Sequence, residues 1–186
     1  MVSEPAEPAR ERRLYFESAS KYDALRSALL PKEDRHGREC GAFLFASALG
    51  NGDLNVGQVV VLNPDDFAAQ TAYHLKLCED TLQRMIVRAH ITNTALIEAH
   101  SHPFSKGPWV RFSPFDCEGL ADTGPHMAWR LPGRPYVALV FGQDAFDSLY
   151  WEGLDRNPQG VMDVVVAGDL LRASRESARA WRRGDG

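Results

Sequence analysis

The sequence contains few cysteines. There are three among 186 residues, Cys40, Cys78 and Cys117, and no pair has the spacing of a CxxC motif. An odd and sparse set of this kind supports neither a disulfide framework nor a cysteine-based zinc site. We therefore expect the three thiols to be reduced.

Long hydrophobic runs and an excess of basic residues are also lacking. No apolar run approaches the roughly 18 residues needed to cross a bilayer, and the first residues, MVSEPAEPARERR, are charged where a signal peptide would be hydrophobic. The sequence therefore predicts a cytoplasmic protein that does not bind membranes. The 21 Lys and Arg residues are outnumbered by 25 Asp and Glu residues, a net charge of −4. This balance argues against a protein whose partner is nucleic acid.

Internal repeats and long linkers are not evident either. Hydrophobic residues make up 44% of the chain and charged residues 25%, which is typical of a globular protein. The length falls within the span of about 100 to 200 residues of one domain. We expect a flexible tail over residues 1–12, which are rich in Glu, Arg and Pro, and a single domain over 13–186.

Hydrophobic periodicity indicates alternating strands and helices, and hence a mixed α/β domain. Apolar residues at steps of three and four predict a helix over 72–89, and Ser113 followed by Pro114 predicts the start of another. A C-terminal helix is expected over 169–183. Shorter apolar segments predict strands at 14–18, 40–49, 55–63, 94–103, 134–142, 148–154 and 161–168.

The most distinctive motif is His-Ser-His-Pro at 100–103, at the end of a predicted strand. Residues two apart on a strand point to the same face, with backbones about 6.5 to 7 Å apart. His100 and His102 would therefore project together as two metal ligands. Asp116, in the first turn of the helix after Ser113, is the best candidate for a third. Two imidazoles and one carboxylate form a ligand set known from catalytic zinc sites, which keep one position open.

A hydrolytic zinc site also needs a general base, and two glutamates compete for that role. Glu98 lies on the same strand and face as His100, whereas Glu39 precedes the apolar segment CGAFLF. Local sequence does not choose between them. The Ser113–Asp116 pattern is also an ordinary capping box, which needs no metal.

These motifs together resemble the JAB/MPN (JAMM) metalloprotease family. The matching segments are Glu39 in RECGAFLF, HSHP at 100–103, and Ser113-Pro-Phe-Asp116. A long predicted helix lies between the two motif strands, and the resemblance covers roughly residues 14–166. It implies an α/β fold with a mixed central β-sheet flanked by helices, similar to that of cytidine deaminases. It also implies one zinc ion held by His100, His102 and Asp116, with Glu39 as general acid/base and Ser113 supporting the oxyanion.

The resemblance further implies the type of substrate. Such enzymes hydrolyse amide or isopeptide bonds at the C-terminus of ubiquitin-like proteins, and so process precursors or remove conjugates. The small format is similar to bacterial members encoded with ubiquitin-like conjugation systems, some of them in antiviral defence. Two alternatives stay open, namely a metal-free scaffold that binds ubiquitin-like partners and a hydrolase of small amino-acid or sulfur-carrier adducts.

One spacing departs from the family pattern. Thirteen residues, 103–115, separate His102 from Asp116, whereas family members usually have ten there. The additional residues fall in the segment FSKGPWVRF. We expect Trp109 in this loop to contact the substrate.

Overall fold

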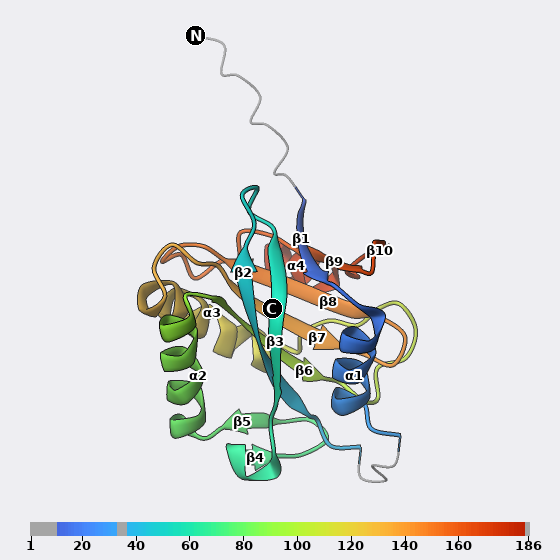
Figure 1. Cartoon of the computed structure of the whole chain (residues 1–186). Helices are drawn as coiled ribbons and strands as arrows, with labels where there is room; N and C mark the ends of the chain where they lie inside the picture. The colour runs from blue at the N-terminus through green and yellow to red at the C-terminus, as the bar shows by residue number, and fades with distance from the viewer. Residues whose placement is uncertain (1–10, 33–36, 185–186) are drawn as a thin grey trace.

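A large, mixed and curled sheet forms the centre of this α/β protein (Figure 1). The computed structural model describes residues 11–32 and 37–184. The strands of the large sheet are β1 (Arg12–Phe16), β2 (Gly41–Ala48), β3 (Leu54–Val61), β6 (Ala95–Ser101), β7 (Tyr136–Phe141), β8 (Phe146–Trp151), β9 (Met162–Val166) and β10 (Asp169–Leu171). A separate two-stranded sheet consists of β4 (Phe67–Gln70) and β5 (Leu75–Leu77). The helices are α1 (Ala19–Leu29), η1 (Pro64–Asp66), α2 (Glu79–Thr92), α3 (Pro114–Arg130) and α4 (Glu176–Arg183).

The large sheet has the strand order β10-β9-β1-β3-β2-β6-β7-β8. β1 pairs in parallel with β3 and β9, and β6 pairs in parallel with β7. The remaining neighbours are antiparallel, and β2 and β3 form a hairpin. The predicted mixed central sheet with flanking helices is therefore confirmed at the level of fold class.

Strand alternation divides the core into two parts. On β2, Leu44 packs in the cluster that includes residues of α1, while Phe43 and Phe45 pack in the cluster that includes residues of α2 and α3. These helices lie on opposite sides of the sheet (Figure 1). The same alternation on β6 places Ile97 in the α1 cluster and Leu96 in the other. Side chains at even positions of β6 therefore face α2 and α3.

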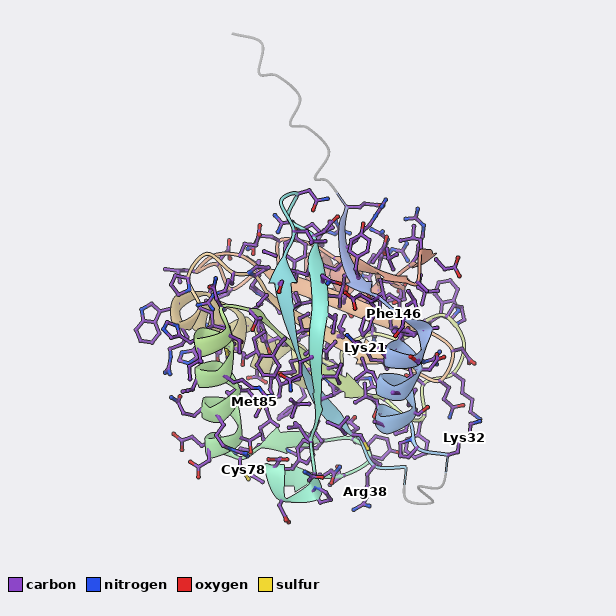
Figure 2. The ribbon with its side chains drawn as sticks, in the orientation of Figure 1. Lys21, Lys32, Arg38, Cys78, Met85 and Phe146 are labelled. Carbon is purple, nitrogen blue, oxygen red and sulfur yellow. The ribbon has the colours of Figure 1, made fainter. Side chains whose placement is uncertain are left out.

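Side chains on both sides attach the helices to the sheet (Figure 2). Lys21 of α1 reaches β3, where its Nζ donates to the carbonyl oxygens of Val56 and Gly57 at 3.2 Å each. On the opposite side, Met85 of α2 is 6% exposed and packs among core residues. Contacts of this kind hold α1 on one side of the sheet and α2 on the other.

The helix predicted over 72–89 is shorter than expected at its N-terminus. It begins at Glu79, and residues 75–77 form β5, which pairs with β4. The turn between β4 and β5 is closed by the Thr71 N–H, which donates to the carbonyl oxygen of His74 at 2.9 Å. Leu75 and Leu77 both pack against the core. Leu75 fits a helical face with Cys78 and Leu82, and it also fits a period of two with Leu77, so periodicity alone misassigned this segment.

The C-terminal helix is also shorter than predicted. Residues 169–171 form β10 against β9, and α4 begins only at Glu176. The connection uses Ala167 and Gly168, whose φ angles are +50° and +98°. Two positive φ angles in a two-residue loop are typical of a tight β-hairpin. Ala167 and Gly168 therefore form a turn that reverses the chain direction between β9 and β10. The helix predicted over 169–183 did not include this hairpin.

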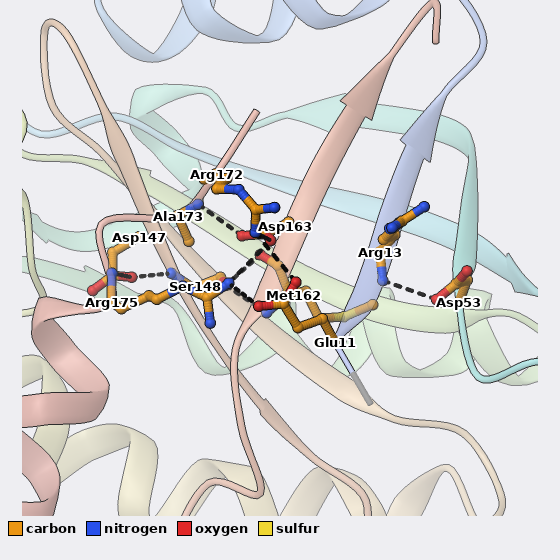
Figure 3. Close-up of polar contacts among 10 residues, drawn as sticks. All are labelled: Glu11, Arg13, Asp53, Asp147, Ser148, Met162, Asp163, Arg172, Ala173 and Arg175. Atoms are coloured by element: carbon orange, nitrogen blue, oxygen red, sulfur yellow. Dashed lines mark hydrogen bonds and ion pairs between the residues drawn. The ribbon is translucent and has the colours of Figure 1, made fainter. Parts of the chain in front are cut away.

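Two buried carboxylates attach this C-terminal segment to the sheet (Figure 3). Asp147 accepts from the backbone N–H groups of Ser148, Arg175 and Ser177 at 2.9, 2.9 and 2.7 Å. Asp163 accepts from the Ala173 N–H at 3.0 Å and pairs with the guanidinium of Arg175 at 3.0 Å. Backbone donors at the start of α4 are thereby satisfied by β8.

The N-terminal boundary differs slightly from the prediction. Arg12 is the first residue of β1, and Glu11 forms ion pairs with Arg172 and Arg175. Glu11 and Arg12, which the prediction assigned to the tail, therefore contact the domain, and residues 1–10 of that tail lie outside the described part of the chain. Among the described residues, no helix combines the length and apolar character needed to span a membrane.

Replacing the buried Asp147 tests its role. The Asp147→Ala variant should lose about 2–4 kcal/mol of unfolding free energy, because three backbone N–H groups would lose their acceptor. Urea denaturation would measure the change. The matched control is Asp169→Ala on β10, where the side chain is exposed and the effect should stay within about 0.5 kcal/mol. Equal stability of the two variants would contradict this role of Asp147.

Candidate metal centre

Two histidines lie at the end of β6, on the side of the sheet that faces α3. His100 is within the strand and 5% exposed. His102 follows the strand, and its backbone N–H donates to the carbonyl oxygen of Phe141 at 2.8 Å. The Nε2 atoms of His100 and His102 are 3.3 Å apart. The two imidazoles expected to project together therefore do so.

Asp116 reaches the same point from the first turn of α3. The backbone N–H and Oγ of Ser113 both donate to its Oδ2, at 2.8 and 2.7 Å, and the Asp116 N–H donates to Ser113 Oγ at 3.1 Å. These contacts form the capping box predicted from the sequence. They orient the carboxylate toward the histidines. The thirteen-residue loop therefore does not displace Asp116 from the pair.

The three side chains form a compact triangle of donor atoms. Asp116 Oδ2 lies 3.6 Å from His100 Nε2 and 3.2 Å from His102 Nε2. With metal–ligand distances of about 2.0–2.2 Å, neighbouring ligands of a tetrahedral zinc ion lie about 3.3–3.6 Å apart. The three distances in this triangle, 3.2, 3.3 and 3.6 Å, lie close to that range. The group of His100, His102 and Asp116 can therefore hold a metal ion, and a set of two imidazoles and one carboxylate suits zinc.

Burial and the neighbouring charges shift the pKa values of this cluster in opposite directions. Burial alone would raise the pKa of Asp116, but hydrogen bonds from His100, His102 and Ser113 lower it well below its usual range. Burial opposes protonation of His100, but the Asp116 carboxylate beside it raises the pKa of that imidazole. A carboxyl group whose pKa is lowered in this way stays ionised, and an ionised carboxylate can bind a divalent cation.

Glu39 is the glutamate that the structure places beside these residues. It is 5% exposed, and its Oε1 lies 3.7 Å from His102 Nε2. Burial raises the pKa of its carboxyl group. The Glu39 N–H donates to the Thr71 carbonyl oxygen at 2.8 Å, and Gln70 Nε2 donates to the Glu39 carbonyl oxygen at 2.9 Å. The β4–β5 hairpin therefore holds the backbone of Glu39 in place.

Glu98, the competing glutamate, is engaged elsewhere. The hydroxyl of Tyr136 donates to its Oε2 at 2.7 Å, and burial raises the pKa of the carboxyl group. Glu98 is not among the three residues that form the triangle. Of the two glutamates, Glu39 is therefore the one within ion-pair distance of a residue of the triangle, His102.

A cavity of about 390 Å³ lies beside the triangle. His100, Asp116 and Glu98 are among its lining residues, together with parts of β2, β5, α2 and α3. This volume is near the lower end of the range of about 300–1,000 Å³ found for small-ligand sites. The candidate metal centre thus adjoins a space that can accept a side chain or a short peptide segment.

The two remaining candidate residues are Ser113, the N-cap of α3, and Trp109 in the loop before it. Ser113 is half-buried and donates its hydroxyl proton to Asp116, so that in this structure it orients the carboxylate. Trp109 is 70% exposed. Its loop is anchored by Phe112, whose N–H donates to Ser177 Oγ at 2.9 Å, and by Val110, whose carbonyl oxygen accepts from Ser174 Oγ at 2.5 Å.

One residue important to the geometry escaped the sequence analysis. Ser101, between the two histidines, is fully buried. Its Oγ accepts from the Cys40 N–H at 3.0 Å, and its own N–H donates to the Cys40 carbonyl oxygen at 3.0 Å. These bonds hold the segment that carries Glu39 against β6. The position of Ser101 between the two histidines could have indicated its importance, but its partner Cys40 is distant in sequence.

Comparison of the sequence with protein-family models and with curated proteins gave no match. The function of this chain is therefore inferred from the residues of the candidate metal centre and of the cavity beside it.

Zinc binding provides a direct test of the triangle. Free zinc at about 100 times its dissociation constant should raise the unfolding free energy of the chain by about 2.7 kcal/mol. Asp116→Ala should abolish this gain because it removes one of three ligands. Calorimetric titration and elemental analysis after gel filtration would measure binding.

His90→Ala is the matched control, since His90 is an exposed residue near the end of α2. It should bind zinc as the unmodified chain does. Equal zinc binding by the Asp116→Ala variant would show that the triangle is not the metal site.

Proposed function

We propose that this chain is a zinc-dependent metallopeptidase of the JAB/MPN type, which hydrolyses amide or isopeptide bonds at the C-terminus of ubiquitin-like proteins. One observation carries the proposal. Three segments distant in sequence bring a buried glutamate, two histidines and an aspartate to one point: Glu39 before β2, His100 and His102 at the end of β6, and Asp116 in α3. A structural role alone would not require a base beside three ligands.

The triangle, Glu39 and Ser113 have separate roles in the proposed hydrolysis. A zinc ion held by the triangle would polarise the scissile carbonyl group and lower the pKa of a bound water to about 7. Glu39 takes the proton from the attacking water and returns it to the leaving amine, so that the amide C–N bond breaks with no net change in protonation of the glutamate. The Ser113 hydroxyl turns from Asp116 toward the oxyanion and supports it.

An extended peptide tail suits the surroundings of this centre. Among the described residues β5 pairs only with β4, so its other edge keeps unpaired backbone groups. β5 also lines the cavity that adjoins His100 and Asp116. A tail added as a strand beside β5 would carry its scissile carbonyl to the metal centre. Ubiquitin-like proteins end in such tails, both as precursors and as conjugates.

Glu39→Gln tests the proposed base. The variant should cleave a ubiquitin-like fusion at least 100-fold more slowly than the unmodified chain, because proton transfer contributes about 10²–10⁴ to such rates. Zinc binding should persist, since Glu39 is not one of the three ligands. The rate would be followed by gel assay or mass spectrometry with zinc-loaded protein.

The control for this variant is Glu17→Gln, an exposed glutamate between β1 and α1, which should leave the rate unchanged. Full activity of Glu39→Gln would exclude the proposed base. Failure of the zinc-loaded unmodified chain to cleave any ubiquitin-like fusion would refute the proposed function.

Trp109 should contribute to substrate binding. Its indole is 70% exposed on the loop between His102 and Asp116, and large exposed aromatic side chains often dominate the energy of protein contacts. Trp109→Ala should raise KM roughly tenfold with little change in kcat. Steady-state kinetics with a ubiquitin-like fusion would separate the two constants. An unchanged KM would remove Trp109 from the substrate surface.

A further inference from the structure

The cavity beside the metal centre contains a carboxyl group that the proposed chemistry does not use. Glu98 lines this cavity, and Tyr136 behind it donates to Oε2 at 2.7 Å. Tyr136 itself is 1% exposed and packs against Trp151, so the hydrogen bond fixes the carboxyl group from within the core. Its position is therefore set by the fold, independently of any ligand.

The second oxygen of Glu98 has no such partner. Within the described part of the chain, Tyr136 provides the only hydrogen bond to this carboxyl group, and no buried side-chain nitrogen or oxygen lacks a partner. Oε1 is therefore accessible, and the space next to Glu98 is the cavity. It can accept one hydrogen bond from a ligand there.

The remaining walls are mainly apolar, apart from Thr123, the exposed Lys76 of β5, and His100 and Asp116 of the triangle. Leu75 and Leu77 of β5, Leu82 of α2 and Leu120 of α3 line the space. At Gly119, on the α3 wall, a Cβ would meet no atom within 4 Å, so that side of the cavity is open. A ligand group complementary to these walls has a long apolar stem and a hydrogen-bond donor at its tip. Lysine and arginine side chains have this form.

Other side chains fit this space less well. An apolar side chain would cover the Glu98 carboxyl group without offering a hydrogen bond, which leaves a desolvated polar group unpaired. An acidic side chain would in addition bring a second carboxyl group close to the first. A site built around a polar group discriminates strongly against ligands that cannot satisfy it.

We propose that this cavity, which we call the Glu98 pocket, selects a lysine or arginine side chain within the four residues that precede the scissile bond of the substrate tail. This inference rests on the proposed function, which places the substrate tail as a strand beside β5. Because β5 also lines the pocket, a side chain of that tail can enter it. Glu98 acts as a specificity residue, and Tyr136 positions it.

The first test varies the tail of a ubiquitin-like fusion one position at a time, with Lys, Arg, Met or Glu at each of the four positions. At one of them Lys or Arg should raise kcat/KM roughly tenfold or more over Met, as expected for a hydrogen bond from a charged donor. In Glu98→Gln the ratio of basic to Met tails should fall to about one. The same ratio in both proteins, or a preference for Met or Glu, would overturn the proposal.

The second test needs neither zinc nor cleavage. Nα-acetyl-lysine N-methylamide and its norleucine counterpart are titrated into the metal-free chain, and backbone amide shifts are followed by NMR. The lysine probe should shift amides of β5 and α3, and the norleucine probe should not. Gly119→Met should abolish the shifts, because its side chain would occupy the pocket without a clash at Cβ.

Gly153→Met is the matched control, since a Cβ at Gly153 also meets no atom within 4 Å and this residue does not line the pocket. It should retain the lysine-induced shifts. Equal shifts with the norleucine probe, or shifts that persist in Gly119→Met, would exclude the Glu98 pocket. If no fusion is cleaved but lysine-specific shifts appear, the proposed function fails while the pocket assignment holds.

Discussion

The register between β2 and β6 determines where the polar side chains of the site meet. Gly41 lies opposite His100 in this antiparallel pair, and just beyond it the backbone of Cys40 exchanges hydrogen bonds with Ser101. A shift of one residue would turn His100 to the other face of the sheet. Because β2 and β6 are central strands buried on both faces, the hydrophobic core strongly disfavours such a shift. Core packing thus specifies the geometry of the candidate site.

Local sequence was sufficient for those parts of the site that lie within one element. The alternation of β6 predicted that the imidazoles of His100 and His102 lie together, and the capping box predicted the start of α3 at Ser113. The choice between Glu39 and Glu98 could not be made locally, because it depends on hydrogen bonds to Ser101 and to the β4–β5 hairpin. The resemblance to the JAB/MPN family pointed to Glu39, and the structure places that residue beside His102.

The fold was predictable to a similar degree. Strongly apolar strands and the class of the fold followed from the sequence, whereas the short elements did not. β5 and β10 have three residues each, too few for a period to be distinguished from part of a helix. Both are held by tertiary contacts, β5 by pairing with β4 and β10 by a tight turn at Ala167 and Gly168. Such short strands can be predicted only when the segments that they pair with are known.

The capping box of α3 has a consequence for how this protein can diverge. Ser113 and Asp116 fix the carboxylate within four residues, so the direction of this ligand does not depend on the length of the chain that leads to it. Insertions before Ser113 would then alter the border of the cavity while leaving the candidate ligands His100, His102 and Asp116 in place. The loop that carries Trp109 is therefore a segment whose length and sequence can change without moving the three candidate ligands.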